Sequence, residues 1–329
     1  MSVVEAFWLG LVQAATEFLP VSSSGHLRLL RGVLGVDVDY DLLFDLVLHL
    51  GTLVAVVVVY RERLAALWRG LVAALRGAAG SRLADAEAVR LVVLLVIATL
   101  PTAVVGVLLS DVVDSDVFSV PVVGALLVLN AGILWSSRRY LGEEPARAVD
   151  ARTGHVGAAA TGIAAAGAES GGVAGATAAV QAAQAAQEER VAVTQGSGWR
   201  AWTYAGIGPA QALAIGLAQG FAVLPGISRS GTTIVVALAL GAMRLRAAEF
   251  SFFLSIPAIL GATVLTWLRA DGDVVSASWA TYVVGALAAA VCGMVALRVL
   301  LGLLERAQLH HFAWYCVAVG GLALMSGMW

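Results

Sequence analysis

The sequence predicts an all-α polytopic membrane protein: an inverted-topology repeat with six full transmembrane helices and two re-entrant helical hairpins. Three observations lead to this fold class. Hydrophobic residues make up 60% of the 329 residues, charged residues only 13%, and the mean hydropathy is +0.88. Six apolar stretches have the length of about 20 residues that a membrane-spanning helix needs. Two further apolar stretches are interrupted by Pro, Gly and Ser and align with each other along the chain.

The composition excludes other classes of protein. A soluble domain usually has about a quarter of its residues charged, and a disordered chain combines low hydrophobicity with high charge. No basic segment precedes the first apolar run, so no cleaved signal peptide is expected. The two cysteines, Cys292 and Cys316, lie in apolar runs without a partnering motif and are expected to be reduced packing residues.

The predicted spans are distributed equally between the two halves of the chain. They cover 42–60, 91–110, 119–137, 250–268, 277–300 and 311–329. Tryptophans near their ends are typical of the membrane interface, and these are Trp135, Trp267, Trp279, Trp314 and Trp329.

Arginine placement predicts the orientation, since all 20 basic residues are arginines. Segments 61–90 and 138–200 hold six arginines each, and the positive-inside rule places both in the cytoplasm. The loop with Asp111, Asp114 and Asp116 and the loop with Asp271 and Asp273 are then outside. Both termini follow on the outer face.

These spans divide the chain into two repeats and an insert. Residues 1–144 form the first repeat and 199–329 the second, which is inverted because each repeat has an odd number of spans. Residues 145–198 are dominated by Ala and Gly and are expected to form a flexible cytoplasmic insert. His155 within it is interpreted as a solvated loop residue.

The interrupted stretches, 5–36 and 203–246, align without gaps at an offset of 206 residues. The matching pairs are Gly10 with Gly216, Gln13 with Gln219, Ser22 with Ser228, Ser24 with Ser230, Gly25 with Gly231, Phe44 with Phe250 and Leu48 with Leu254. Irregular backbone at membrane depth is tolerated only inside the protein or beside a wet cavity. Re-entrant hairpins satisfy this condition, and paired broken helices are typical of transporter-like scaffolds with the site at the repeat interface.

Glu17 is the first candidate for chemistry. A carboxylate inside an apolar membrane helix is costly, so it is a functional-site hypothesis. Gln13 lies four residues earlier on the same helical face. The alternative is that Glu17 only caps or braces the following loop.

The loop Ser22–His26 follows Glu17 and favours anion binding. Small residues let backbone amides converge, and a helix that starts there directs its positive end at the cavity. His26 can donate to a phosphate oxygen or relay a proton. The alternative is a Ser-rich helix cap with a histidine packed behind it.

Arg229 lies in the middle of the second loop, Pro225–Gly231, opposite the first loop in the predicted repeat. Its planar guanidinium needs an anionic partner and suits phosphate. An ion pair with Glu17 and no substrate is the alternative, and the two roles are compatible.

Other polar residues carry weaker signals. Asp45 and His49, four residues apart, are interpreted as packing residues, with a contact behind the site or to a metal as the weaker alternative. Glu249 is interpreted as a dipole-favouring residue at a helix start, and His310 and His311 as interfacial. No metal-ligand spacing, Walker loop or nucleic-acid motif is found.

The motifs Gln13–His26 and Pro225–Gly231 together resemble the undecaprenyl-diphosphate phosphatase family, the bacitracin-resistance membrane phosphatases. The likeness includes Phe44–Tyr60 and Glu249–Gly261 and omits only the insert. It implies hydrolysis of a polyprenyl diphosphate to the monophosphate, an active site open to the outer face, and a divalent cation, Mg or Ca. The partners implied are the lipid substrate and membrane lipids; a homodimer is compatible with it, and no nucleic acid is expected.

The resemblance also implies roles for individual residues. Glu17 matches the main acidic residue and a cation contact, Ser23 the nucleophile or a phosphate contact, His26 the loop histidine and Arg229 the diphosphate-binding arginine. The expected diphosphate contacts are Ser22, Ser24, Gly25, Gly226, Ser228, Ser230 and Gly231. Gln13 stands where the two-carboxylate form of the motif has a glutamate, so it can support the site but cannot act as a base.

Two rival functions use the same residues. A lipid-phosphate or small-anion transporter would suit the inverted repeat, with Glu17, His26 and Arg229 binding without catalysis. An unrelated acid-phosphatase-type lipid phosphatase is suggested by Ser24-Gly25-His26, but its accompanying basic motif is missing.

Overall fold

A computed structural model describes residues 1–34, 42–76, 83–113, 115, 117–141, 207–269 and 278–326, and every regular element in these ranges is a helix. The α-helices are α1 (Val3–Phe18), α2 (Ser23–Leu34), α3 (Leu42–Val59), α4 (Arg61–Leu75), α5 (Leu83–Val113), α6 (Val120–Ser136), α9 (Pro209–Phe221), α10 (Arg229–Ala239), α11 (Arg244–Arg269), α12 (Trp279–Glu305) and α13 (Phe312–Ser326). Two short 3₁₀ helices are η1 (Ser137–Arg139) and η2 (Leu309–His311). Met1–Gly142 and Gly206–Trp329 form one compact unit. The predicted insert 145–198 and the loop with Asp271 and Asp273 lie outside the described residues.

Five helical segments within the described ranges are long and apolar enough to cross a membrane. They are Glu87–Val113, Val120–Arg139, Arg244–Leu268, Trp279–Glu305 and Leu309–Ser326. Each overlaps a predicted span, so this part of the prediction is confirmed. The multi-pass membrane class follows from these helices.

The remaining predicted span, 42–60, differs from the expectation of six uninterrupted helices. The helical run Leu43–Val59 qualifies only together with Arg61–Leu75, and the two are bent by 79° at Tyr60. Tyr60 leaves the helical conformation there, with φ −99° and ψ 16°. The described helices therefore give five spans, or up to six if the bent pair is one span. Hydropathy alone does not report such a bend.

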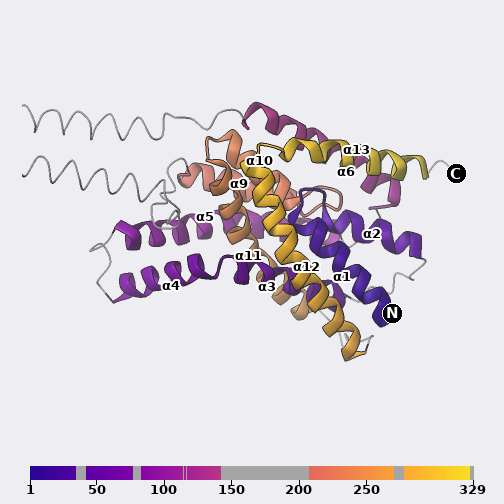
Figure 1. The fold of residues 1–329 in the computed structure, drawn as a ribbon, viewed down its shortest axis with the longest axis horizontal. Helices are drawn as coiled ribbons and strands as arrows, with labels where there is room; N and C mark the ends of the chain where they lie inside the picture. The colour runs from indigo at the N-terminus through magenta and orange to yellow at the C-terminus, as the bar shows by residue number, and fades with distance from the viewer. Residues whose placement is uncertain are drawn as a thin grey trace, which may run out of the picture. The chain divides into compact units, whose positions relative to one another are not determined.

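Helices from opposite halves of the chain pack closely against each other. In Figure 1, α1 lies beside α12, and α6 lies beside α13. Glycines make this approach feasible: a Cβ added to Gly10 would lie 2.5 Å from the Gly285 carbonyl oxygen. Likewise α9 of the second half packs on α5 of the first half, and a Cβ on Gly216 would lie 2.0 Å from the Ala98 carbonyl oxygen. Small residues at interfaces are how membrane helices associate without a hydrophobic driving force.

Two helix–loop–helix units place the predicted loops. α1 ends at Phe18 and α2 begins at Ser23, while α9 ends at Phe221 and α10 begins at Arg229. The two loops are capped alike: Ser22 Oγ accepts from Gly25 N at 3.3 Å, and Ser228 Oγ accepts from Gly231 N at 3.0 Å. Both helix starts therefore use a serine three residues before a glycine, as the aligned sequences suggest.

The interpretation of Glu249 as a helix-start residue is wrong. Glu249 lies inside α11, is 1% exposed, and forms ion pairs with Arg63 of α4 at 2.8 Å and with Arg246 at 3.0 Å. The helix begins earlier, at Arg244. The two cysteines are free thiols, as expected.

Candidate active site

The two loops meet through an ion pair. Arg229 is the first residue of α10, and Glu17 lies in the last turn of α1. Arg229 Nη2 donates to Glu17 Oε1. The Glu17 side chain is 9% exposed and the Arg229 side chain 24% exposed. A buried carboxylate and a guanidinium are stable at membrane depth only when each has a partner. The pair therefore joins the two predicted candidates directly.

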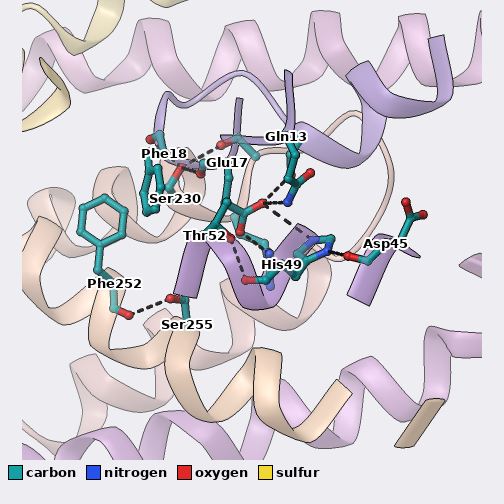
Figure 2. Close-up of polar contacts among 12 residues, drawn as sticks. Gln13, Glu17, Phe18, Asp45, His49, Thr52, Ser230, Phe252 and Ser255 are labelled. Carbon is teal, nitrogen blue, oxygen red and sulfur yellow. Dashed lines mark hydrogen bonds and ion pairs between the residues drawn. The ribbon is translucent and has the colours of Figure 1, made fainter. Parts of the chain in front are cut away.

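The second carboxylate oxygen of Glu17 collects three further polar groups. Ser23 Oγ donates to Glu17 Oε2 at 2.5 Å, and Gln13 Nε2 donates to the same oxygen at 3.1 Å. His49 Nε2 lies 3.8 Å from the same oxygen, whereas Arg229 contacts the other carboxylate oxygen. Figure 2 shows Gln13 and His49 directed at Glu17. Glu17 is thus the hub of the polar cluster.

A cavity of about 230 Å³ opens beside this cluster. Its polar lining consists of Thr16, Glu17, Ser23, Ser24, Asp45, His49, Ser228, Arg229 and Thr266. Its apolar lining consists of Leu46, Val113, Ala222, Val223, Ile227, Ile259 and Ala262. The first residues of α2 and α10 both belong to the polar lining, so two helix N-termini reach the cavity. Helix N-termini favour anions.

The loop serines mostly serve to hold the loops together. Gly226 N donates to Ser22 Oγ at 3.0 Å, across the two loops. Ser230 Oγ donates to the carbonyl oxygens of Glu17 and Phe18, both at 3.2 Å. Among the expected diphosphate contacts, Ser24 and Ser228 line the cavity, whereas Ser22, Gly25, Gly226, Ser230 and Gly231 do not. Their role as ligands stays a prediction.

His26 lies apart from the Glu17–Arg229 pair. Its Nδ1 is 2.8 Å from the Ser22 carbonyl oxygen and its Nε2 is 2.9 Å from Tyr315 Oη on α13. The His26 and Tyr315 rings are stacked, with an interplanar angle of 11°. His26 is not among the residues that line the cavity. Its catalytic role stays a prediction, and Tyr315 carried no signal in the sequence that separated it from other aromatic residues of the last span.

The structure favours the weaker alternative for Asp45 and His49, a contact behind the site, over the packing interpretation. Both residues line the cavity, and His49 faces Glu17. Their spacing of four residues on one helix face was a usable signal. The sequence could not show that α3 turns this face to the end of α1.

Asn130 of α6 is a further polar residue that the sequence reasoning missed. It is fully buried, it donates to the Pro20 carbonyl oxygen, and it accepts from Ser228 N. A polar side chain in the middle of an apolar span is itself a signal. Asn130 therefore contacts both loops from a third helix.

The donor set near Glu17 fits a divalent cation held largely by its substrate. The described residues contain no cluster of three or more His, Cys, Asp or Glu side chains that could hold a metal ion alone. Gln13 Oε1 is buried without a hydrogen-bond partner, next to the Glu17 carboxylate. Magnesium is usually bound by one or two protein oxygens together with phosphate and water oxygens. Glu17 lines the cavity and can supply one such oxygen, whereas Gln13 is fully buried and does not line the cavity.

Comparisons with known proteins match nearly the whole chain. The sequence model of the family described as "Bacitracin resistance protein BacA" matches residues 6–197 and 186–322. A protein of Desulfosudis oleivorans named undecaprenyl-diphosphatase is 36% identical over 332 residues, which covers 100% of both chains. A protein of Desulforudis audaxviator with the same name is 33% identical, covering 97% of this chain and 96% of the relative. One of Syntrophotalea carbinolica, again with this name, is 32% identical over 98% of both.

Proposed function

This chain belongs to the family of the bacitracin resistance protein BacA, and we propose that it is an integral membrane undecaprenyl-diphosphatase. It hydrolyses an undecaprenyl-type diphosphate to the monophosphate and inorganic phosphate, and so recycles the lipid carrier for cell-envelope glycan synthesis. The observation that carries this function is the Glu17–Arg229 pair beside a cavity reached by two helix N-termini. The names of the relatives do not favour a transporter.

Arg229 and the two helix starts bind the diphosphate. Arg229 is only partly covered, so its guanidinium can exchange Glu17 for phosphate oxygens without leaving the cavity. A planar guanidinium binds phosphate through two parallel hydrogen bonds. Positioning and charge neutralisation are the main tasks of a protein in phosphoryl transfer.

Once Arg229 has moved to the phosphate, Glu17 is free to accept a proton. Ser23 Oγ already donates to Glu17 at 2.5 Å, which suits a serine that attacks phosphorus while its proton passes to the carboxylate. Direct attack by a water that Glu17 deprotonates uses the same geometry. In both routes the P–O bond to the lipid monophosphate breaks, and the monophosphate leaves. In the serine route the phosphoryl group stays on Ser23 Oγ until a water attacks the phosphorus, breaks the Oγ–P bond and releases inorganic phosphate.

A divalent cation, Mg or Ca, belongs to this proposal. Glu17 would hold it from the cavity, and when bound it would neutralise charge on the diphosphate oxygens. Gln13 itself orients the Glu17 carboxylate through its amide hydrogen bond at 3.1 Å. It has no proton-accepting role, because an amide is not a base at neutral pH.

His26 is assigned a supporting role toward a phosphate oxygen. It reaches the cavity only by rotating away from Tyr315, with which it is in contact at 2.9 Å. In the resting arrangement Tyr315 and Ser22 hold both ring nitrogens. Its contribution therefore depends on a side-chain movement that substrate binding must drive.

The proposed architecture is an inverted repeat with two re-entrant hairpins and an active site open to the outer face. Two observations support the repeat. The two loops have matching serine caps, and the first helix of each repeat packs on a helix of the other repeat, α1 on α12 and α9 on α5. The arginine distribution supports the orientation, with both termini outside. A homodimer is an assembly compatible with this proposal.

Phosphate release by the purified protein in detergent tests the function. The substrate series consists of prenyl diphosphates of increasing chain length, each with magnesium, with calcium and with chelator. We expect release of inorganic phosphate from undecaprenyl diphosphate that depends on the cation. Transport has no meaning without a membrane, so absence of release with either cation would favour a transporter instead.

A further inference from the structure

We propose that Asn130 is a positioning residue that holds the two loops together so that Arg229 meets Glu17. The inference rests on the proposed phosphatase function and deepens it, because it adds a residue from α6 to a site built from α1, α2 and α10. Neither the sequence motifs nor the lining of the cavity includes Asn130.

The side-chain amide of Asn130 uses its donor and its acceptor at the same time. Its Nδ2 donates to the Pro20 carbonyl oxygen at 3.0 Å, and its Oδ1 accepts from Ser228 N at 3.1 Å. Nδ2 also lies 3.4 Å from Cys316 Sγ on α13. The residue is 0% exposed. An amide in this apolar setting is stable only because each of its atoms has a partner.

The two bridged backbone groups lie next to the groups that do the chemistry. Ser228 immediately precedes Arg229, and Pro20 lies between Glu17 and Ser23. Both backbone groups belong to non-helical segments, where buried amides and carbonyls need partners from outside the helix ladder. Asn130 supplies those partners from a single rigid helix, so it sets the position of one loop relative to the other.

A direct hydrogen bond between the two loops adds to the contacts that Asn130 makes with both of them. Gly226 N donates to Ser22 Oγ at 3.0 Å, and Ser22 adopts the uncommon φ of 70° there. With two ties the loops can neither slide nor rotate freely against each other. Small errors of placement cost rate: a misplacement of about 1 Å far from the reacting atoms lowers turnover by about a hundredfold.

Three variants of the full-length protein in detergent test the proposal. Asn130→Leu has a similar size and loses both hydrogen bonds. Thr102→Val is the matched control, because Thr102 Oγ1 of α5 donates to the Gly216 carbonyl oxygen at 2.8 Å, across helices but away from both loops. We expect N130L to lower kcat for undecaprenyl diphosphate by at least about tenfold, with KM changed less. We expect T102V to stay within about twofold of wild type.

Asn130→Asp separates positioning from general stability and serves if N130L fails to fold. The ionised carboxylate can accept from Ser228 N but cannot donate to Pro20, whereas the protonated carboxyl can do both. The described charged or titratable groups on the elements that pack around α6 are Tyr315 and Cys316 on α13, His26 and Arg28 on α2, Arg229 on α10, Arg138 and Arg139 in η1, and His310 and His311 in η2. Wild type contains the same groups, so the activity of N130D is divided by that of wild type at each pH. We expect the N130D to wild-type ratio to rise as pH falls from about 8 to about 5.5.

Several results would overturn the proposal. These are wild-type turnover in N130L, an equal loss in T102V, or an N130D ratio that does not change with pH. If wild type itself releases no phosphate, the proposed function fails, and amide hydrogen exchange decides the positioning claim separately. We then expect faster exchange in 222–231 but not in 209–221 of N130L or N130D, and unchanged exchange in 222–231 would contradict the claim.

Discussion

Among single residues, the proposed mechanism depends on one ion pair in a chain that has few charges. Glu17 and Arg229 could form a purely structural pair, which is the alternative that the sequence left open. The structure contains that pair, but both residues also line the cavity, and the Arg229 side chain is partly exposed. A pair that served only stability would need neither the cavity nor the exposed part of the guanidinium, and burying both charges costs desolvation energy. The geometry therefore favours a pair that opens to bind an anion.

Replacement of Arg229 by alanine tests the binding role of the guanidinium. We expect Arg229→Ala to lower turnover by at least about a hundredfold, on the scale of removing one preorganised charge donor from an active site. Arg139→Ala is the control, because Arg139 is an exposed arginine in η1. Steady-state phosphate release measures both. Near-normal turnover in the Arg229 variant would remove this residue from the mechanism.

The sequence identified Glu17, Ser23 and Arg229 because a charge or a Ser/Gly loop in an apolar chain is conspicuous. It did not identify the partners that reach the site from elsewhere. His49 and Asn130 face it from α3 and α6, and their importance depends on packing between segments that are distant in sequence. His26 shows the converse: its motif is clear, but its ring points to Tyr315. Motifs locate loops better than they locate side-chain directions.

At the scale of helices, the bend between α3 and α4 is held by an ionic cluster. Glu249 of α11 pairs with Arg63 of α4 and with Arg246, and all three are largely buried. Tyr60, at the bend, packs its ring against Phe253 with a centroid distance of 5.2 Å. The cluster ties α4 to α11 directly beyond the bend. Hydropathy could not predict this arrangement, because Arg63 and Glu249 are 186 residues apart in the sequence.

Removal of the Glu249 charge tests the cluster. We expect Glu249→Gln to lower the free energy of unfolding by about 3–5 kcal/mol, since two buried guanidiniums lose their carboxylate partner. Glu87→Gln is the matched control: its pair with Arg90 is long, at 3.9 Å, and partly exposed, so a change below about 1 kcal/mol is expected. Denaturation in detergent measures both. Equal effects in the two variants would contradict the assignment.

Gly226 tests the close contact between the second loop and α6. It has a φ of 109°, and an added Cβ would lie 2.6 Å from Leu126 Cβ and 2.8 Å from the Val123 carbonyl oxygen. We expect Gly226→Ala to reduce the yield of folded protein and its activity together, because both backbone strain and overlap arise. Gly261→Ala is the control, since nothing lies within 4 Å of its Cβ position. Unchanged folding and activity in the Gly226 variant would refute the close packing.

At the scale of the whole molecule, apolar surface faces outward along the spans. Leu100, Val104 and Leu108 of α5 are all more than half exposed. Such a surface is stable against lipid tails and unstable against water. Composition was enough to predict this class, because the chain has too few charges to cover a soluble surface. The apolar stretches along the chain were enough to predict five spans, but not the bend at Tyr60 or the true starts of α5 and α11.

The role of Glu17 in phosphate release is decided by assaying wild type and Glu17→Gln side by side on undecaprenyl diphosphate, in detergent with a divalent cation. The glutamine keeps the size of Glu17 but loses its charge and its capacity to accept a proton. The account predicts multiple turnovers by wild type and a loss of at least about a hundredfold in the folded variant. Turnover by the variant close to that of wild type, or no turnover by wild type, would contradict it.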